Sequence, residues 1–196
     1  LPKHAHYRAL VDPALTAAAI REREGFVRAT INELIDGWID EYEIEFIDRF
    51  AEPLPMMVIA ELLGFPRMDL PQLKEWSFAW VWPFSRGLTL EEELWAVNKH
   101  IELQHYIFET MQRKRANPQN DIITRLTQIE VEDVDLGRKR PLTDTEIIGI
   151  TDHLLIGGNE TTTFAISNGL WLLFRNPDVY RELQADRGKI KGFVEE

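Results

Sequence analysis

A short polar segment in the last third of the sequence combines groups that can handle protons. Residues 157–163 read GGNETTT, and apolar residues flank them on both sides. Glu160 directly precedes Thr161, and a carboxylate beside a hydroxyl suits general acid–base chemistry. Two glycines would let a ligand approach the backbone closely. A helix bent by its own hydroxyl groups, with a solvated polar patch, would explain the same residues without any chemistry.

A second pair of candidate ligands lies near the start of the chain. His4 and Arg8 are four residues apart, so on a helix their side chains share one face. Two such donors suit a pair of carboxylates. A solvated helix end is the alternative, and it is the commoner origin of such pairs.

The polar segment needs a helix to hold it, and helical spacing dominates the whole sequence. Thr143 and Glu146 form a capping-box pattern, and the helical pattern continues to Arg175 before Asn176-Pro177 ends it. At about 1.5 Å per residue, this helix would be roughly 50 Å long. We expect it to be the central element of the fold.

Shorter helices are expected elsewhere in the chain. Every second residue from Trp76 to Phe84 is aromatic, which is typical of a strand, but Pro83 and the flanking pattern favour a helix end that runs into a loop. The sequence predicts a mainly α fold, a helical bundle around one long central helix. The other expected elements are helices at 8–15, 22–38, 56–63, from about 69, 90–115 and 121–126, and a loop or small hairpin at 129–141.

Composition excludes several classes of protein. The 196 residues, 44% of them hydrophobic, can bury one core, so we expect a single domain, or part of one, across 1–196. A net charge of −11 disfavours nucleic acid and anionic lipid as partners. No apolar run approaches the roughly 20 residues of a membrane span, and no leader pattern opens the chain, so we expect a cytoplasmic protein. The absence of cysteine excludes disulfides, Cys-based zinc sites and a thiolate ligand for iron from these residues.

Four stretches resemble the cytochrome P450 family, and they occur in the family's order. Residues 157–162 match the oxygen-binding pattern (A/G)-G-x-(D/E)-T-(T/S) of the family's long central helix at every defined position. Residues 4–11, HAHYRALV, look like the H-x-x-x-R-x-L-V stretch in which His and Arg bind heme propionates. Residues 53–65 resemble the segment PLPVxVIAxLLGVP. Residues 193–196 resemble the start of the E-x-x-R helix, with Glu196 as its Glu.

This resemblance implies a partial P450 domain that lacks the N-terminal β region and the C-terminal cysteine loop. It implies a heme-dependent monooxygenase that inserts one atom of dioxygen into a small organic, apolar substrate, with heme b as cofactor. Electrons would come from NAD(P)H through a ferredoxin-type donor and its reductase. The 196 residues alone would be inactive, because no cysteine ligates the iron.

The resemblance also assigns roles to individual residues. Thr161 would present a hydroxyl to dioxygen, and Glu160 would pass protons inward from solvent. Helical spacing places His153 and Ile156 on the same face, so we expect them to line the substrate pocket. An ordinary buried histidine bonded to a neighbouring carbonyl is the alternative for His153. The expected cofactor-binding residues are His4, Arg8, Leu154, Gly157 and Gly158.

A non-catalytic helical module that binds a ligand or a partner is the alternative function. A terpene cyclase is disfavoured, because the sequence contains no D-D-x-x-D motif. His100 and His105, five residues apart, do not share a helix face and make a poor metal pair. The aromatic residues between Trp76 and Phe84 could roof a substrate pocket, although core packing explains them equally well.

Overall fold

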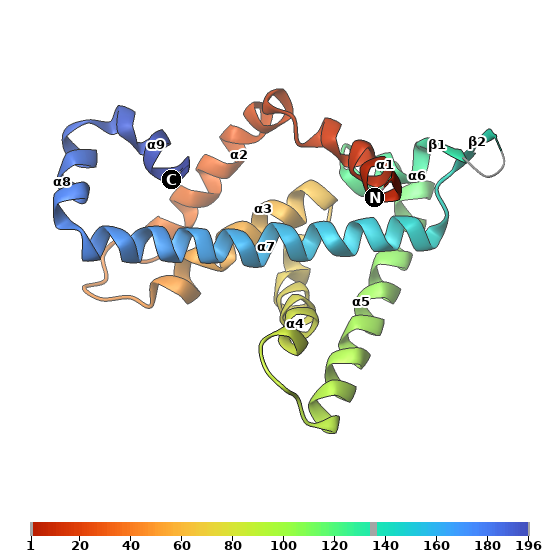
Figure 1. The fold of residues 1–196 in the computed structure, drawn as a ribbon, viewed down its shortest axis with the longest axis horizontal. Coiled ribbons are helices and arrows are strands. Elements are labelled where there is room, and N and C mark those ends of the chain that lie inside the picture. The colour runs from red at the N-terminus through yellow and green to blue at the C-terminus, as the bar shows by residue number, and fades with distance from the viewer. Residues whose placement is uncertain (1, 134–136, 196) are drawn as a thin grey trace.

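One long helix crosses the whole molecule and organises the rest of the fold. The computed structural model describes residues 2–133 and 137–195, and the side chains of residues 2–6 and 14 lie outside this description. Figure 1 shows α7, Asp144–Arg175, running from one end of the molecule to the other. It begins with the expected capping box: the Glu146 N–H donates to Thr143 Oγ1 at 3.3 Å, and the Thr143 N–H donates to Glu146 Oε2 at 2.8 Å. The prediction of a long central helix is confirmed.

The N-terminal elements differ from the sequence prediction in their boundaries. A helix at 8–15 was expected, but α1 spans Pro2–Val11, and a 3₁₀ turn, η1, follows at Asp12–Ala14. Pro13 explains the early end, because proline lacks an N–H and its ring clashes with the preceding turn of a helix. The next helix, α2, spans Ala17–Asp36 and starts earlier than expected, because the Thr16 side chain accepts a hydrogen bond from the Ala19 N–H.

The segment at 53–65 forms a helix that ends as expected. A short π-helix, η2, spans Ile47–Ala51, and α3 follows at Pro53–Leu63. Gly64 caps α3 in the left-handed conformation with φ of 82°. A Cβ atom at this position would also overlap the Asp121 carboxylate, so both backbone conformation and space require glycine.

The alternating aromatic residues belong to the end of a helix, as predicted. After a 3₁₀ turn, η3, at Arg67–Asp69, α4 spans Leu70–Val81, and η4 continues it at Trp82–Phe84. A second capping box starts α5, which spans Leu90–Ala116.

The expected short helix and hairpin follow. The short helix α6 spans Ile122–Gln128. Strands β1, Glu130–Asp133, and β2, Arg138–Pro141, pair antiparallel in a hairpin, with Val131 opposite Arg140. After α7 come α8 at Pro177–Ala185, η5 at Arg187–Lys189 and α9 at Ile190–Glu195.

The core lies between α7 and the helices α3, α4, α5 and α6. Gly158 of α7 allows α3 to approach closely, because a Cβ atom there would lie 3.0 Å from the Ile59 side chain. Apolar side chains from all of these helices are fully or almost fully buried. They include Leu63, Leu73, Leu103, Ile107, Met111, Ile123, Ile147 and Leu155.

A buried ion pair ties α5 to α6. Lys114 Nζ donates to Asp121 Oδ2 at 2.5 Å and to Gln119 Oε1 at 2.6 Å. The side chains of Lys114 and Asp121 are only 8% and 4% exposed. Because both charged groups are removed from water, loss of either one would leave the other buried without a counter-ion.

The C-terminal half of α7 presents large apolar side chains to the surface. Phe164 is 60% exposed, Trp171 58% and Phe174 76%. The N-terminal half differs, since Ile147, Leu155 and Ile156 are buried against the neighbouring helices.

Candidate active site

Three successive threonines in the middle of α7 bond to the preceding helical turn. The hydroxyls of Thr161, Thr162 and Thr163 donate to carbonyls four residues earlier, at 2.7, 3.1 and 3.1 Å. Such bonds share the carbonyl acceptors with the backbone N–H groups of the helix. Each hydroxyl is therefore held in place before any ligand arrives.

Gly157 and Thr161 share an exposed stretch of α7. A Cβ atom added at Gly157 would meet nothing within 4 Å, in contrast to Gly158 one residue further on. Thr161 is exposed and its hydroxyl bonds to the Gly157 carbonyl. A flat ligand could therefore approach the helix backbone at Gly157, beside the Thr161 hydroxyl.

Glu160 is held on another side of the helix, toward α4. Ser77 Oγ donates to Glu160 Oε1 at 3.4 Å, and Asn159 Nδ2 donates to Ser77 Oγ at 3.1 Å. Burial, and secondarily the negative charge of Glu52, raise the pKa of Glu160 above its ordinary value, while the Ser77 bond and Lys74 oppose the shift. A half-buried carboxyl with a raised pKa is suited to carry a proton.

The residues expected to line the substrate pocket lie in different surroundings. His153 is exposed, its Nδ1 lies 2.7 Å from the Gly149 carbonyl oxygen, and its ring packs edge-on against Trp80 with centroids 6.0 Å apart. Because a carbonyl only accepts, Nδ1 carries the proton. Ile156 is buried, and Leu154 is half-buried against the core. The alternative explanation for His153 was a buried histidine bonded to a neighbouring carbonyl. The hydrogen bond to the carbonyl is present, but His153 is not buried.

The expected propionate ligands lie on α1. Arg8 is 71% exposed and forms a loose ion pair with Asp12 at 3.6 Å, so its guanidinium can reach another anion. The His4 side chain and Glu196 lie outside the described residues. Tyr7, Leu10 and Val11 instead turn toward the core.

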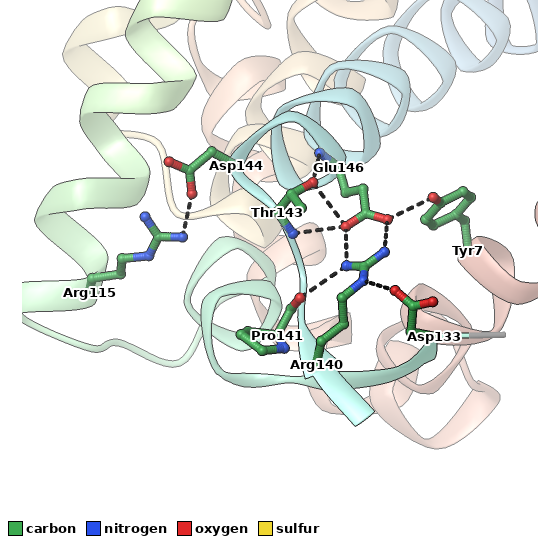
Figure 2. A network of polar contacts seen from close by, with 8 residues as sticks. All are labelled: Tyr7, Arg115, Asp133, Arg140, Pro141, Thr143, Asp144 and Glu146. Carbon is green, nitrogen blue, oxygen red and sulfur yellow. Dashed lines mark hydrogen bonds and ion pairs between the residues drawn. The ribbon is translucent and has the colours of Figure 1, made fainter. Parts of the chain in front are cut away.

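Sequence reasoning missed a polar network at the start of α7, which Figure 2 shows. Arg140 of β2 donates to both carboxylate oxygens of Glu146, at 2.7 and 2.8 Å, and to Asp133 of β1 at 2.8 Å. Tyr7 of α1 donates to Glu146 Oε1 at 2.8 Å. The bonds from Arg140 are the main cause that holds the pKa of Glu146 well below its ordinary value. The capping-box pattern identified Glu146, but no sequence spacing indicates Tyr7 or Arg140 as its partners.

A second missed contact joins α5 to α7. His100 Nε2 lies 2.9 Å from Asp152 Oδ2, and Asp152 is almost completely buried. The prediction that His100 and His105 make a poor metal pair considered only these two residues, which lie on the same helix. The carboxylate partner of His100 comes from another helix, 52 residues away in the sequence.

Comparisons to known proteins agree with the fold. Residues 72–194 match the family model described as Cytochrome P450. The chain is 34% identical over its whole length to the Cyclomarin C epoxidase CymV of Salinispora arenicola, and covers 48% of that protein. It is 30% identical to the Steroid C26-monooxygenase of Mycobacterium tuberculosis, again over its whole length and 48% of the relative.

Solved structures give the same result. P450BioI, in complex with an acyl carrier protein ligated to hexadec-9Z-enoic acid, superposes with a TM-score of 0.88 at 28% identity, over 99% of this chain and 48% of that one. CYP109E1 from Bacillus megaterium, in complex with testosterone, superposes with a TM-score of 0.83 at 33% identity, over 99% and 50%.

The chain belongs to the cytochrome P450 family, and the mainly α, partial P450 fold is confirmed. It spans about half the length of the curated relatives it matches. Within residues 2–133 and 137–195, no helix is both long enough and apolar enough to cross a bilayer.

Proposed function

We propose that this chain supplies the oxygen-side half of the active site of a heme-dependent monooxygenase. One observation carries the proposal. The open backbone at Gly157 and the fixed hydroxyl of Thr161 share one side of α7. Glu160 directly precedes Thr161 in the sequence, and it is a half-buried carboxyl with a raised pKa on another side of the helix. This arrangement combines space for a flat cofactor with two groups that can carry protons.

The residues present fit one face of heme b. When bound, heme would supply the activation of dioxygen by electron transfer. Gly157 would leave room for the ring and for dioxygen, whereas Gly158 packs against Ile59 of α3 and Leu154 packs against the core. Arg8, together with His4, would bind the propionates. No cysteine occurs in the sequence, so a thiolate ligand would have to come from outside these residues.

The roles of the catalytic residues follow from their surroundings. Glu160 would exchange a proton between the half-buried space beside Ser77 and the Thr161 side of α7. The Thr161 hydroxyl would then hold that proton beside Gly157, since it can donate and accept at once. Both side chains would act in proton handling, and neither would form a covalent bond to substrate.

We propose a small organic, largely apolar substrate, which the exposed His153 would help to position, whereas Ile156 is buried. The names of the relatives refer to an epoxidase, a steroid monooxygenase and a complex with an acylated carrier protein. Family membership alone therefore does not identify the chemical class of the substrate. Electrons would come from NAD(P)H through a ferredoxin-type donor and its reductase in the cytoplasm. The acyl carrier protein bound to one structural relative suggests that a carrier-bound substrate is also worth testing.

The carbon monoxide spectrum of the reduced protein tests this proposal. Protein that carries this chain together with a downstream cysteine loop should take up heme and show a thiolate-type band. The 196 residues alone should show no such band. A thiolate-type band from them would refute the inference that the thiolate ligand comes from outside these residues. If the longer protein takes up no heme, the alternative of a non-catalytic helical module gains support.

A further inference from the structure

Helix α1 carries the expected propionate ligands, and it contacts the rest of the molecule through a different face. Leu10 and Val11 are buried in the core, and Tyr7 packs against the same cluster. Arg8 is exposed. Apolar packing is non-directional, so Leu10 and Val11 alone leave the rotation of this short helix about its axis weakly determined.

The Tyr7 hydroxyl supplies the directional contact. It donates to Glu146 Oε1 at 2.8 Å, and this bond joins residues 139 apart in the sequence. Successive residues of an α-helix are about 100° apart around its axis. A bond that determines the direction of Tyr7 therefore also determines the direction in which the neighbouring Arg8 leaves the helix.

Glu146 is a rigid acceptor for this bond. Arg140 donates to both of its oxygens, and Thr143 donates to it through its backbone N–H and its hydroxyl at 2.8 and 2.9 Å (Figure 2). Arg140 is itself held by Asp133 across the hairpin. The carboxylate is thus tied to the first turn of α7 and to β2 by contacts that do not involve α1.

We propose that Tyr7 is a positioning residue, which sets the orientation of Arg8 toward a heme propionate by anchoring α1 to Glu146 at the start of α7. This inference rests on the proposed function, because it takes Arg8 as a propionate ligand. The network ties α1 to the same helix that carries Gly157 and Thr161. It would therefore fix the two heme-binding parts of the chain relative to each other.

Heme release from the heme-loaded protein that includes the cysteine loop tests the inference. Tyr7→Phe removes the hydroxyl and keeps the ring in the core. Loss of one hydrogen bond to a charged group should speed transfer of heme to apomyoglobin by about fivefold or more. It should also shift the midpoint potential of the heme. Tyr42→Phe is the matched control, because Tyr42 is fully exposed, and it should change neither value.

A double-mutant cycle separates positioning from a general loss of stability. If Tyr7 acts through Arg8, Tyr7→Phe should speed heme release in the wild-type background and have almost no further effect in an Arg8→Ala background. Equal acceleration in both backgrounds, or none in either, would overturn the inference. Glu146→Gln is a second variant that keeps the capping-box pattern and removes the charge, and its effect should again depend on Arg8. Failure of the wild-type protein to hold heme would instead refute the proposed function itself.

Discussion

Glu160 and Thr161 are neighbours in the sequence, but their side chains meet different surroundings. Glu160 is tied to α4 through Ser77, whereas Thr161 lies exposed with its hydroxyl on the Gly157 carbonyl. Adjacent helical residues point about 100° apart, so one can face a partly buried polar site while the other faces an open side of the helix.

The hydroxyl of Thr161 can be tested against that of its neighbour. In the proposed monooxygenase, Thr161→Ala should divert electrons to free hydrogen peroxide and lower the product formed per dioxygen consumed. Thr162→Ala is the matched control, because Thr162 is also exposed and bonds to the preceding turn in the same way. Measuring peroxide, product and oxygen uptake tests the role of the Thr161 hydroxyl. An unchanged ratio of product formed to dioxygen consumed in Thr161→Ala would exclude that role.

The raised pKa of Glu160 gives a prediction for stability. A carboxyl whose folded pKa lies above its unfolded value of 4.5 opposes folding when it is ionised. That unfavourable contribution is absent below pH 4.5 and grows as the pH rises through the folded pKa. Glu160→Gln should therefore gain stability relative to wild type as the pH rises above 4.5. Urea unfolding across this range measures the gain, and a difference independent of pH would contradict the assigned shift.

At the scale of the helix, the two adjacent glycines of α7 should respond oppositely to alanine. Gly157→Ala adds a methyl group to open space and should stabilise the helix by about 0.5–1 kcal/mol, since alanine is the better helix former. Gly158→Ala would push against Ile59 at 3.0 Å, so its helical gain should be cancelled by displacement of α3. Equal unfolding midpoints for the two variants would show that α3 and α7 are not closely packed there.

The helix boundaries show which parts of the fold could be predicted from the sequence. Local signals sufficed for both ends of α7, because a capping box marks its start and Asn-Pro marks its end, and Asn-Pro likewise follows α5. The start of α2 was placed too late, because the Thr16 cap lies outside its amphipathic pattern. Periodicity reports which face of a helix is apolar and gives little information about where a cap begins it.

Contacts between segments far apart in the chain could not be predicted from the sequence. The capping role of Glu146 follows from a spacing of three residues, but its bond to Tyr7 depends on how α1 docks. The same holds for His100 and Asp152, which meet only because α5 crosses α7. The motif at 157–162 could be identified, because its chemistry lies within two turns of one helix.

At the scale of the whole molecule, the buried pair of Lys114 and Asp121 should dominate the polar contribution to stability. Asp121→Asn keeps a good cap for α6, whose Thr124 N–H donates to Asp121 Oδ1 at 2.7 Å. It leaves the Lys114 charge buried without its counter-ion, so the free energy of unfolding should fall by about 3–5 kcal/mol.

An exposed ion pair provides the control for this variant. Asp144 lies 2.6 Å from Arg115, and both side chains are more than a third exposed. Asp144→Asn should cost about 1 kcal/mol or less, because solvent screens the pair. Chemical denaturation of both variants would test the contrast, and a similar small loss at both sites would mean that water reaches Lys114.

The apolar side chains on the C-terminal half of α7 affect how these residues behave in solution. Phe164, Trp171 and Phe174 give one end of the chain an exposed aromatic surface of the kind that promotes association. Handled without a covering partner, the 196 residues should bind a hydrophobic dye and scatter more light as concentration rises. Serine at these three positions should lower both signals, which makes the triple variant the practical form for handling the chain alone.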